Sequence, residues 1–458
     1  MKVVIIGAGP AGLACAYELA KKNIEVEVHE LTLFNGGMAR TIDLWGQKVD
    51  LGPHRFFSKN NRVNNFFFDV LGDEYVSIKR KTRIYFNKRF YNYPLDVKNI
   101  ILNFNLFEGL SIISSYILQK FKNNNNPENF EEWVISKFGK RLYNIFFKSY
   151  TEKLWGISCN KIDSSWASQR IRNLSLWRVF KSVLFNNNEY RTLINYFNYP
   201  KYGAGSLYDK VASRLTMNGI KIFYKSKIVE IFKKNTKIFL KLDNNRIVET
   251  DYLVSTMPLT TLANILKDVP YEIKSAANQL YYRNTILVYL EIDKSFIFED
   301  NWIYIHDNNV KTGRITNFRN WSLDICQDME STILCLEYWA FDNDDIWNMN
   351  SDSLIQLAKK ELLEIVLITD IDLITNAYVH KIPKCYPVYE TGYEKALEMV
   401  KEHLSNYPEI IPIGRAGSFK YNNQDHSILM GLMASDQITG SSDMNLWELN
   451  SNSEYQEE

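Results

Sequence analysis

The sequence predicts an α/β protein in which a parallel sheet of the Rossmann type carries an inserted helical region and an antiparallel-sheet domain. Residues 2–6, 11–22 and 24–29 have the patterns of a buried strand, a helix and a second strand, which together form a βαβ unit. Similar strand patterns return only after a long aromatic-rich stretch, which indicates an insertion. Residues 284–293 and 331–338 alternate as antiparallel strands do. At 458 residues the chain has room for two or three domains.

The βαβ unit carries a dinucleotide-binding fingerprint, G-x-G-x-x-G, between its first strand and its helix. Gly7 permits the tight turn, Gly9 lets a pyrophosphate approach the backbone, and Gly12 lets the helix pack closely on the sheet. The N–H groups at the start of the helix are suited to bind phosphate. Glu30, at the end of the second strand, is suited to accept ribose hydroxyls. The unit therefore predicts a site for an ADP-containing dinucleotide.

Composition and charge argue against a nucleic-acid-binding protein and against a membrane-spanning one. A hydrophobic content of 46% and a charged content of 23% are typical of a soluble globular chain. The net charge of +1, without a sustained basic face, argues against nucleic acid as a partner. The sequence has no run of 18 apolar residues, so we expect no membrane-spanning helix. The apolar N-terminal run contains the glycine fingerprint and does not resemble a signal peptide, so we expect a cytoplasmic protein.

The cysteines are scattered and form no C-x-x-C pair. We expect them to be free thiols in a reducing compartment, and they offer no metal site. The five are Cys15, Cys159, Cys326, Cys335 and Cys385.

Residues 83–205 are predicted to be a largely helical insertion, because they are rich in aromatic residues and lack the βαβ rhythm. One amphipathic helix is marked by apolar residues at helical spacing, namely Leu106, Leu110, Ile113, Ile117 and Phe121. Its apolar stripe is expected to face the core. A helix lying on a membrane surface is the alternative, which leaves peripheral membrane contact open. Residues 122–127 are predicted as a loop, and Phe130 as the start of another helix.

After the insertion the dinucleotide-binding domain is expected to resume. Strands are predicted at 221–224, 228–232, 236–242, 252–255 and 410–413, with a last helix from about Ser427. The polar, acidic tail is expected to be poorly ordered. The predicted division is 1–82, 206–275 and 391–440 for the dinucleotide-binding domain, 83–205 for the helical insertion, 276–390 for the substrate-domain sheet and 441–458 for the tail.

Two further segments near the N-terminus point to the same cofactor site. Gly36 and Gly37 bring backbone against a ligand, and Arg40 supplies a cation for its diphosphate. The Gly-Pro bend within residues 50–57 would present His54 beside a ring system. A single histidine is more often structural, so both interpretations of His54 remain open.

With these motifs the chain resembles the FAD-dependent superfamily of amine oxidases, protoporphyrinogen oxidases and UDP-galactopyranose mutases. The resemblance runs from residue 1 to about residue 435. It is carried by Gly36–Thr41 (GGMART), Gly52–Phe57 (GPHRFF), Phe138–Leu142 (FGKRL), Phe146–Gly156 (FFKSYTEKLWG), Gln169–Ile171 (QRI) and Gly414–Asp425 (GRAGSFKYNNQD).

The resemblance implies FAD as the cofactor, in a domain of the glutathione-reductase type beneath an antiparallel sheet. The mutases of this superfamily isomerise a nucleotide-linked pyranose to its furanose form, with N5 of reduced flavin attacking the anomeric carbon. The resemblance therefore implies a nucleotide-sugar substrate and a role in surface polysaccharide biosynthesis. Carried over to this chain, Trp155 and Tyr421 would line the pocket for sugar and nucleotide. Core packing is the alternative for Trp155. Arg170 and Arg415 would clamp the diphosphate.

Physical chemistry agrees with these roles. Guanidinium groups bind phosphate oxygens bidentately and stay charged, so two arginines would stabilise a leaving diphosphate. In the superfamily the last helix directs its positive N-terminal end at the flavin, which makes Asp425 and the amides near Ser427 expected cofactor contacts. Ser427 as the N-cap of that helix is the simpler interpretation. Gly414 and Val229 complete the expected cofactor contacts.

The chain also departs from the mutase pattern. Asn423 stands where mutases have an aspartate, and Arg55 follows His54 where mutases have an apolar residue. Residues 313–322 resemble oxidases instead, and Arg314 or Arg319 could replace the mobile mutase arginine. The alternatives to a mutase-like isomerase are an oxidase or desaturase, which passes electrons from a C–H bond to O2 or another acceptor, and a non-catalytic flavin-binding protein.

Overall fold

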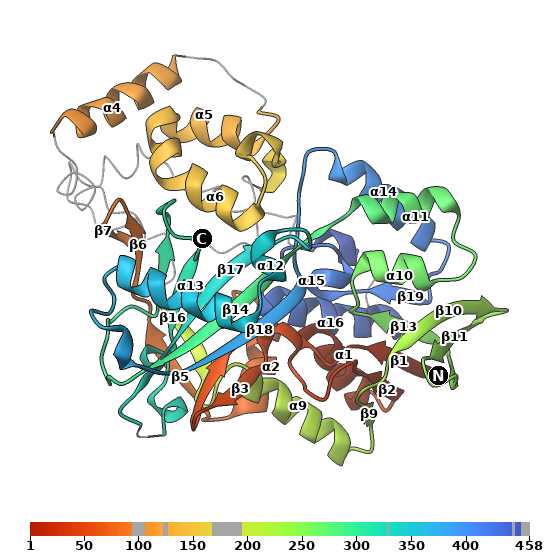
Figure 1. Cartoon of the computed structure of the whole chain (residues 1–458). Helices are drawn as coiled ribbons and strands as arrows, with labels where there is room; N and C mark the ends of the chain where they lie inside the picture. The colour runs from red at the N-terminus through yellow and green to blue at the C-terminus, as the bar shows by residue number, and fades with distance from the viewer. Residues whose placement is uncertain (94–105, 122–126, 167–194, 328, 442–444, 450–458) are drawn as a thin grey trace.

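The computed structural model describes the chain except for residues 94–105, 122–126, 167–194, 328, 442–444 and 450–458 (Figure 1). A five-stranded parallel sheet with its helices forms one part of the molecule, and a seven-stranded sheet forms the other. The helices α4, α5 and α6 stand beyond the seven-stranded sheet, at the top left of Figure 1. The predicted α/β class, with a helical region and an antiparallel-sheet domain added to the parallel sheet, is confirmed.

The parallel sheet brings together strands from both ends of the chain. Its order is β19-β13-β1-β2-β9, and every neighbouring pair is parallel. The strands are β1 (Lys2–Ile6), β2 (Glu25–His29), β9 (Lys221–Phe223), β13 (Tyr252–Ser255) and β19 (Ile410–Pro412). All five lie within one residue of their predicted bounds. Their mainly apolar side chains suit a parallel sheet, which is covered on both faces.

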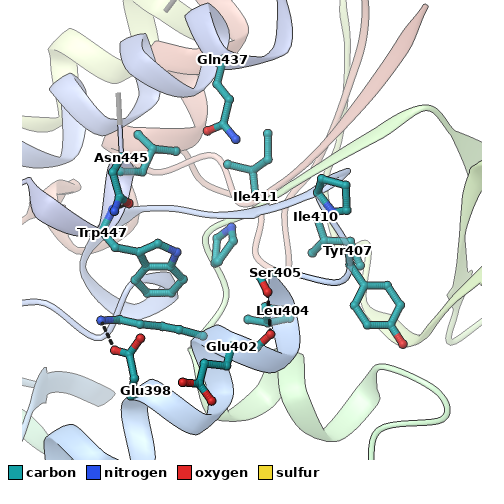
Figure 2. Close-up of a pocket in the computed structure, with 14 residues that line it drawn as sticks. Glu398, Glu402, Leu404, Ser405, Tyr407, Ile410, Ile411, Gln437, Asn445 and Trp447 are labelled. Atoms are coloured by element: carbon teal, nitrogen blue, oxygen red, sulfur yellow. Dashed lines mark hydrogen bonds and ion pairs between the residues drawn. The ribbon is translucent and has the colours of Figure 1, made fainter. Parts of the chain in front are cut away.

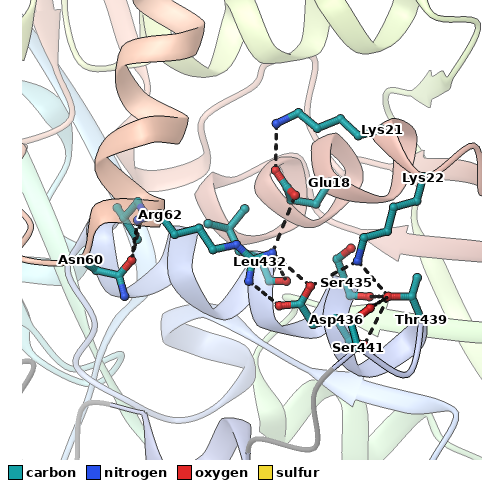
Figure 3. A network of polar contacts seen from close by, with 11 residues as sticks. Glu18, Lys21, Lys22, Asn60, Arg62, Leu432, Ser435, Asp436, Thr439 and Ser441 are labelled. Atoms are coloured by element: carbon teal, nitrogen blue, oxygen red, sulfur yellow. Dashed lines mark hydrogen bonds and ion pairs between the residues drawn. The ribbon is translucent and has the colours of Figure 1, made fainter.

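Four helices pack around this sheet. They are α1 (Pro10–Lys21), α2 (Asn61–Leu71), α9 (Gly205–Met217) and α16 (Gln424–Ile438). Contact between α1 and α16 is close, because a Cβ at Gly431 would lie 2.2 Å from the carbonyl oxygen of Ala11. At the other end of both helices, Asp436 pairs with Arg62 of α2 and with Lys22 (Figure 3). This network ties α1, α2 and α16 into one support for the cofactor side.

The start of α16 differs from the prediction. The helix begins at Gln424, and its N-cap is Asn423 in a capping box with His426. Ser427 therefore lies inside the first turn, and its assignment as the N-cap was wrong. The capping box satisfies two backbone N–H groups at once, which favours the earlier start.

The seven-stranded sheet has the order β18-β14-β17-β16-β15-β6-β7. Its strands are β6 (Thr82–Phe86), β7 (Arg89–Tyr93), β14 (Tyr282–Ile292), β15 (Trp302–Ile305), β16 (Arg314–Asn317), β17 (Thr332–Ala340) and β18 (Ile374–Pro387). The predicted strands at 284–293 and 331–338 are β14 and β17. The helix α13 (Ser351–Glu364) packs against β14 and β18, and the short α12 (Asp345–Asn348) precedes it.

The strands β6 and β7 correct the prediction of a largely helical region from residue 83. They pair with each other, and β6 runs parallel to β15, with Thr82 opposite Trp302. This partner lies more than two hundred positions away in the sequence, so no local pattern could reveal the pairing.

The helical region contains α4 (Leu106–Lys120), α5 (Phe130–Leu142), a π-helical turn (Tyr143–Phe147) and α6 (Lys148–Trp155). The predicted start at 130 is correct, and the amphipathic helix predicted from Leu106 to Phe121 coincides with α4. Of the predicted apolar stripe, the side chains of Leu106, Leu110 and Ile113 lie outside the described ones. Ile117 and Phe121 are 49% and 84% exposed, so this part of the prediction is wrong, and Ile112 and Tyr116 are buried instead. Close approach of α5 sets this rotation, since a Cβ at Gly139 would lie 3.0 Å from the carbonyl oxygen of Ser115.

No helix within the described ranges is long and apolar enough to cross a membrane.

Smaller sheets and helices complete the fold. The remaining strands are β3 (Thr41–Leu44), β4 (Gln47–Asp50), β5 (Tyr75–Lys79), β8 (Tyr196–Pro200), β10 (Ile228–Lys234), β11 (Lys237–Leu242) and β12 (Ile247–Thr250). The remaining α-helices in the described ranges are α10 (Leu259–Ile265), α11 (Tyr271–Gln279), α14 (Tyr393–Leu404) and α15 (Gly414–Gly417). All five cysteines are buried and free.

The tail is more structured than expected over a short stretch. Leu446–Glu448 forms a 3-10 turn in which Leu446 is buried. Lys420 holds this turn by donating hydrogen bonds to the carbonyl oxygens of Trp447 and Leu449. The remainder of the tail lies largely outside the described residues.

Candidate functional site

Two adjoining cavities lie between the parallel sheet and the seven-stranded sheet. The first is lined by predicted cofactor contacts, namely Gly7, Gly9, Glu30, Gly37, Gly414 and Ser427. The second is lined in part by the seven-stranded sheet, which contributes Trp302, Tyr304, Arg314 and Tyr386 among others. Met38, His54, Arg415, Asn423 and Gln424 line both. The cavities have volumes of about 190 and 150 Å³.

The phosphate end of the first cavity is built from backbone. A Cβ at Gly7, where φ is +98°, would lie 2.0 Å from Oγ1 of Thr256. A Cβ at Gly9 would meet only the backbone of Gly37, at 3.8 Å or more, so two glycines face each other there. The N-cap of α1 is Gly9, which makes no side-chain capping bond, so the N–H groups of the first turn can bind an anion. This geometry fits the pyrophosphate of a dinucleotide.

Glu30 is fixed beside this end of the cavity. Its Oε2 accepts a hydrogen bond of 2.8 Å from the backbone N–H of Ala8. Its Oε1 accepts bonds of 2.8 Å from the N–H and the hydroxyl of Thr32. A carboxylate has about four lone-pair sites, so Glu30 retains capacity for a ribose hydroxyl. The residues present therefore fit FAD at its adenosine and pyrophosphate groups.

The N-terminal end of α16 faces the junction of the two cavities. Gln424 donates hydrogen bonds of 2.9 Å to the carbonyl oxygens of His54 and Arg55. It also accepts one of 2.8 Å from the hydroxyl of Tyr208. Ser427 lines the first cavity, whereas Asp425 is buried with its Oδ1 3.1 Å from Nδ1 of His426. The partial positive charge of the helix end favours an electron-rich group at this junction.

The structure does not bring the other predicted cofactor residues to the described cavity wall. Gly12 lies behind it, where a Cβ would come within 2.0 Å of the carbonyl oxygen of Gly7. The guanidinium carbon of Arg40 stands 4.4 Å from the ring centre of Phe34. Val229, 36% exposed, lies at a bulge in β10. Cofactor contacts by Asp425, Arg40 and Val229 remain predictions.

Three arginines and one carboxylate line the second cavity. Nε and Nη2 of Arg314 each donate a 2.6 Å hydrogen bond to the carboxylate of Glu337, so this buried pair is neutral overall. Burial, together with the positive charge of Arg415, lowers the pKa of His54 to about 3, so its imidazole is neutral. Within the described residues, no salt bridge joins Arg415 to a carboxylate, so Arg415 adds a positive charge to this cavity wall.

Arg415 is held against an aromatic wall. The rings of Tyr386 and Tyr421 stack with centroids 5.3 Å apart. The guanidinium carbon of Arg415 lies 5.2 and 5.1 Å from those two ring centres, in the range of cation–π contacts. Nε of Arg415 donates a 2.8 Å hydrogen bond to the carbonyl oxygen of Asn422. The arrangement orients the guanidinium, as an anion clamp requires.

Trp155 occupies the core rather than the described cavity wall. It is 1% exposed, and its ring centre lies 5.1 Å from that of Trp166 and 5.9 Å from that of Tyr421. It therefore supports Tyr421, which lines the cavity, from behind. The alternative interpretation of Trp155 as core packing is the one that the geometry supports. Arg170 lies outside the described residues.

Sequence reasoning missed part of the cavity wall. The aromatic residues Trp302, Trp321 and Tyr386 line it, as does Glu337. The only local signal was Glu337 itself, a charged residue within the apolar strand β17. Aromatic residues are so frequent in this chain that the others carried no individual signal.

A separate cavity lies between α14, β19 and the tail, lined by Trp447, Leu404, Ile410 and Glu402 among others (Figure 2). None of the predicted site residues that the structure describes lines it.

Comparisons with known proteins identify the relatives of this fold. The family described as flavin-containing amine oxidoreductase matches residues 10–377. The chain is 26% identical over 351 residues to a 1-hydroxycarotenoid 3,4-desaturase of Flavobacterium sp., covering 70% of each chain. It is 25% identical to a probable UDP-galactopyranose mutase of Klebsiella pneumoniae over 221 residues, 46% of this chain and 52% of the relative.

Solved structures show the same fold. A reduced UDP-galactopyranose mutase superposes with a TM-score of 0.87 at 24% identity, covering 98% of this chain and 97% of its own. A putative protoporphyrinogen oxidase from Exiguobacterium sp. 255-15 superposes with a TM-score of 0.76 at 15% identity, covering 96% of this chain and 99% of its own.

Proposed function

The chain belongs to the family of flavin-containing amine oxidoreductases, and from this premise we propose that it is an FAD-dependent enzyme that isomerises a nucleotide-linked sugar between pyranose and furanose forms without net oxidation. Similarity to the Klebsiella pneumoniae mutase and to the reduced mutase structure supports this choice within the family.

The observation that carries the proposal is the charge of the second cavity. Three arginines and one carboxylate line it; Glu337 pairs with Arg314, His54 is neutral, and Arg415 adds a positive charge. A diphosphate bridge carries about two negative charges and accepts bidentate bonds from guanidinium groups. An uncharged hydrocarbon substrate would gain nothing from these arginines and would strip them of water, which is costly. The lining therefore favours an anionic substrate.

Each group of residues has a defined part in this proposal. Gly9, Gly37 and the first turn of α1 bind the pyrophosphate of FAD, and Glu30 binds its ribose. When bound, FAD in its reduced form would supply a nucleophilic ring nitrogen. Arg415, oriented by the tyrosine stack, stabilises the diphosphate as negative charge builds on it.

The position of the reaction in the cell follows from its substrate. An activated furanose is consumed by glycosyl transfer, so we propose a role in surface polysaccharide biosynthesis in the cytoplasm. This role depends on the assignment of a nucleotide sugar as the substrate.

An oxidase or desaturase is the second candidate. It is favoured by the match to the 1-hydroxycarotenoid 3,4-desaturase, which covers more of the chain than the curated mutase does. The aromatic wall formed by Trp302, Trp321 and Tyr386 also suits an apolar, planar substrate. In this case the substrate would lose hydride and an acceptor would have to accept the electrons.

Binding of UDP to the FAD-loaded protein tests the substrate class. We expect saturable binding that Arg415→Gln weakens at least tenfold, because a guanidinium bond to phosphate is lost. Arg319→Gln is the matched control, since Arg319 binds the carbonyl oxygens of Met329 and Ser331 and does not line the cavity. Equal affinities of the wild type and Arg415→Gln would contradict the proposed clamp.

A further inference from the structure

Lys153, in α6, binds a cage of backbone carbonyl groups. Its Nζ lies 3.0, 2.8, 3.0 and 3.1 Å from the carbonyl oxygens of Ile305, Asp307, Val310 and Thr312. An ammonium has only three N–H donors, so the four oxygens share them. All four belong to the end of β15 and the connection that leads to β16. Lys153 thus fixes one short stretch of chain at four points.

The same connection is held by neighbouring groups on two helices. From α6, the hydroxyl of Ser149 donates to the carbonyl oxygen of His306, whose ring stacks on Tyr150 with centroids 4.8 Å apart. From α13, the carboxylate of Glu361 accepts from the backbone N–H groups of Lys311 and Thr312. The carbonyl groups are therefore presented to Lys153 by a preformed loop.

Within the described part of the chain, no carboxylate lies in salt-bridge range of this ammonium. Burial lowers the pKa of Lys153 to about 8, against the favourable charges of Glu361 and Asp307. The group is therefore still cationic at neutral pH. Its charge is balanced mainly by carbonyl dipoles, as that of a bound potassium or ammonium ion would be.

The two strands held in this way supply part of the second cavity. Tyr304 of β15 and Arg314 of β16 line its wall, on either side of the connection that Lys153 binds. We infer that Lys153 is a positioning residue, a built-in cation that sets the β15–β16 hairpin and thereby places Tyr304 and Arg314 for substrate binding. The inference deepens the proposed function, on which it rests for the identity of the substrate.

Chemical rescue provides the test. In the FAD-loaded protein, Lys153→Ala removes the ammonium and opens a space that n-propylammonium can fill. We expect amide hydrogen exchange in peptides covering residues 302–317 to accelerate at least tenfold in this variant. Millimolar n-propylammonium should restore protection, whereas tetramethylammonium, which has no N–H donor, should not. Lys148→Ala, an exposed lysine in the same helix, is the matched control and should exchange like the wild type.

A second variant separates charge from packing. Lys153→Met fills most of the same space without a cation, so it should show the same loss of hairpin protection. Wild-type exchange in Lys153→Met would overturn the inference, as would a loss in Lys153→Ala that no n-propylammonium concentration reverses. Acceleration spread equally over β14 and β17 would also overturn it, because it would indicate general unfolding.

A measurement of UDP binding distinguishes failure of this inference from failure of the proposed function. If UDP binds, Lys153→Met should weaken it at least fivefold, whereas Lys148→Ala should leave it unchanged. If the wild type binds no UDP but exchange and rescue behave as expected, the proposed function fails and the positioning role stands. If UDP binds equally well to the wild type and Lys153→Met, the positioning role fails and the proposed function stands.

Discussion

The side-chain amide of Gln424 donates a 2.9 Å hydrogen bond to the carbonyl oxygen of His54, across 370 positions of sequence. This bond joins the first turn of α16 to the Gly52–Phe57 segment, where the two cavities meet. Segments from near both ends of the chain therefore meet at the junction of the cofactor cavity and the second cavity. The relationship explains why fingerprint residues near each end are needed to define a single site.

Alanine substitutions at two glycines of the fingerprint should have different effects, one on FAD binding and the other on stability of the fold. Gly9→Ala adds a methyl group whose nearest neighbour, the backbone of Gly37, lies at an ordinary 3.8 Å, so the protein should fold normally. The methyl group would occupy the pyrophosphate position, so FAD retention should fall at least tenfold. Gly12→Ala should instead destabilise the fold, because its Cβ would lie 2.0 Å from the carbonyl oxygen of Gly7. Flavin absorbance after gel filtration and urea unfolding measure the two effects. Full flavin occupancy in Gly9→Ala would show that the pyrophosphate lies elsewhere.

The buried pair of Arg314 and Glu337 should behave as one unit. Removing either partner leaves an uncompensated buried charge, so Arg314→Met or Glu337→Leu should each cost about 3–5 kcal/mol in the free energy of unfolding. The double variant should cost clearly less than the sum of the single variants, because it removes both charges together. Urea unfolding of all four proteins measures this coupling. Additive losses would mean that the two side chains do not interact in solution.

Asp50 should give the protein a specific pH dependence. Burial raises the pKa of Asp50 to about 7, although hydrogen bonds from Thr41, Tyr199 and Ala204 oppose this shift. An unfolded aspartate titrates near pH ~3.9, so between about pH 4 and 7 the native state holds a proton that the unfolded state has lost. The contribution of this group to stability therefore falls as pH rises through that window, by up to about 1.4 kcal/mol per pH unit.

Asp50→Asn removes that titration. Between pH 4 and 7, the free energy of unfolding of the wild type should fall as pH rises. That of the variant should fall less over the same range. Parallel profiles for the two proteins would show that Asp50 is ionised in the native state throughout this range.

The features that could be predicted from the sequence were those with local signals. The first βαβ unit and the strands β13, β14 and β17 follow from apolar periodicity and from the glycines. Pairing of β6 with β15 and the neutralisation of Arg314 by Glu337 depend on contacts between distant segments, and local patterns do not record them. Trp155 shows the same limit at the site, because a motif identifies the residue but not whether its ring faces the cavity or the core.

Product analysis with the reduced, FAD-loaded protein tests the central claim most directly. Incubated anaerobically with candidate nucleotide sugars such as UDP-galactopyranose, the protein should convert one of them to a furanose isomer of the same mass, with many turnovers per flavin and no added acceptor. Chromatography and NMR of the sugar product measure this conversion. Turnover that instead requires an electron acceptor, and yields a product two hydrogen atoms lighter than its substrate, would contradict the redox-neutral mechanism and establish the oxidase or desaturase in its place.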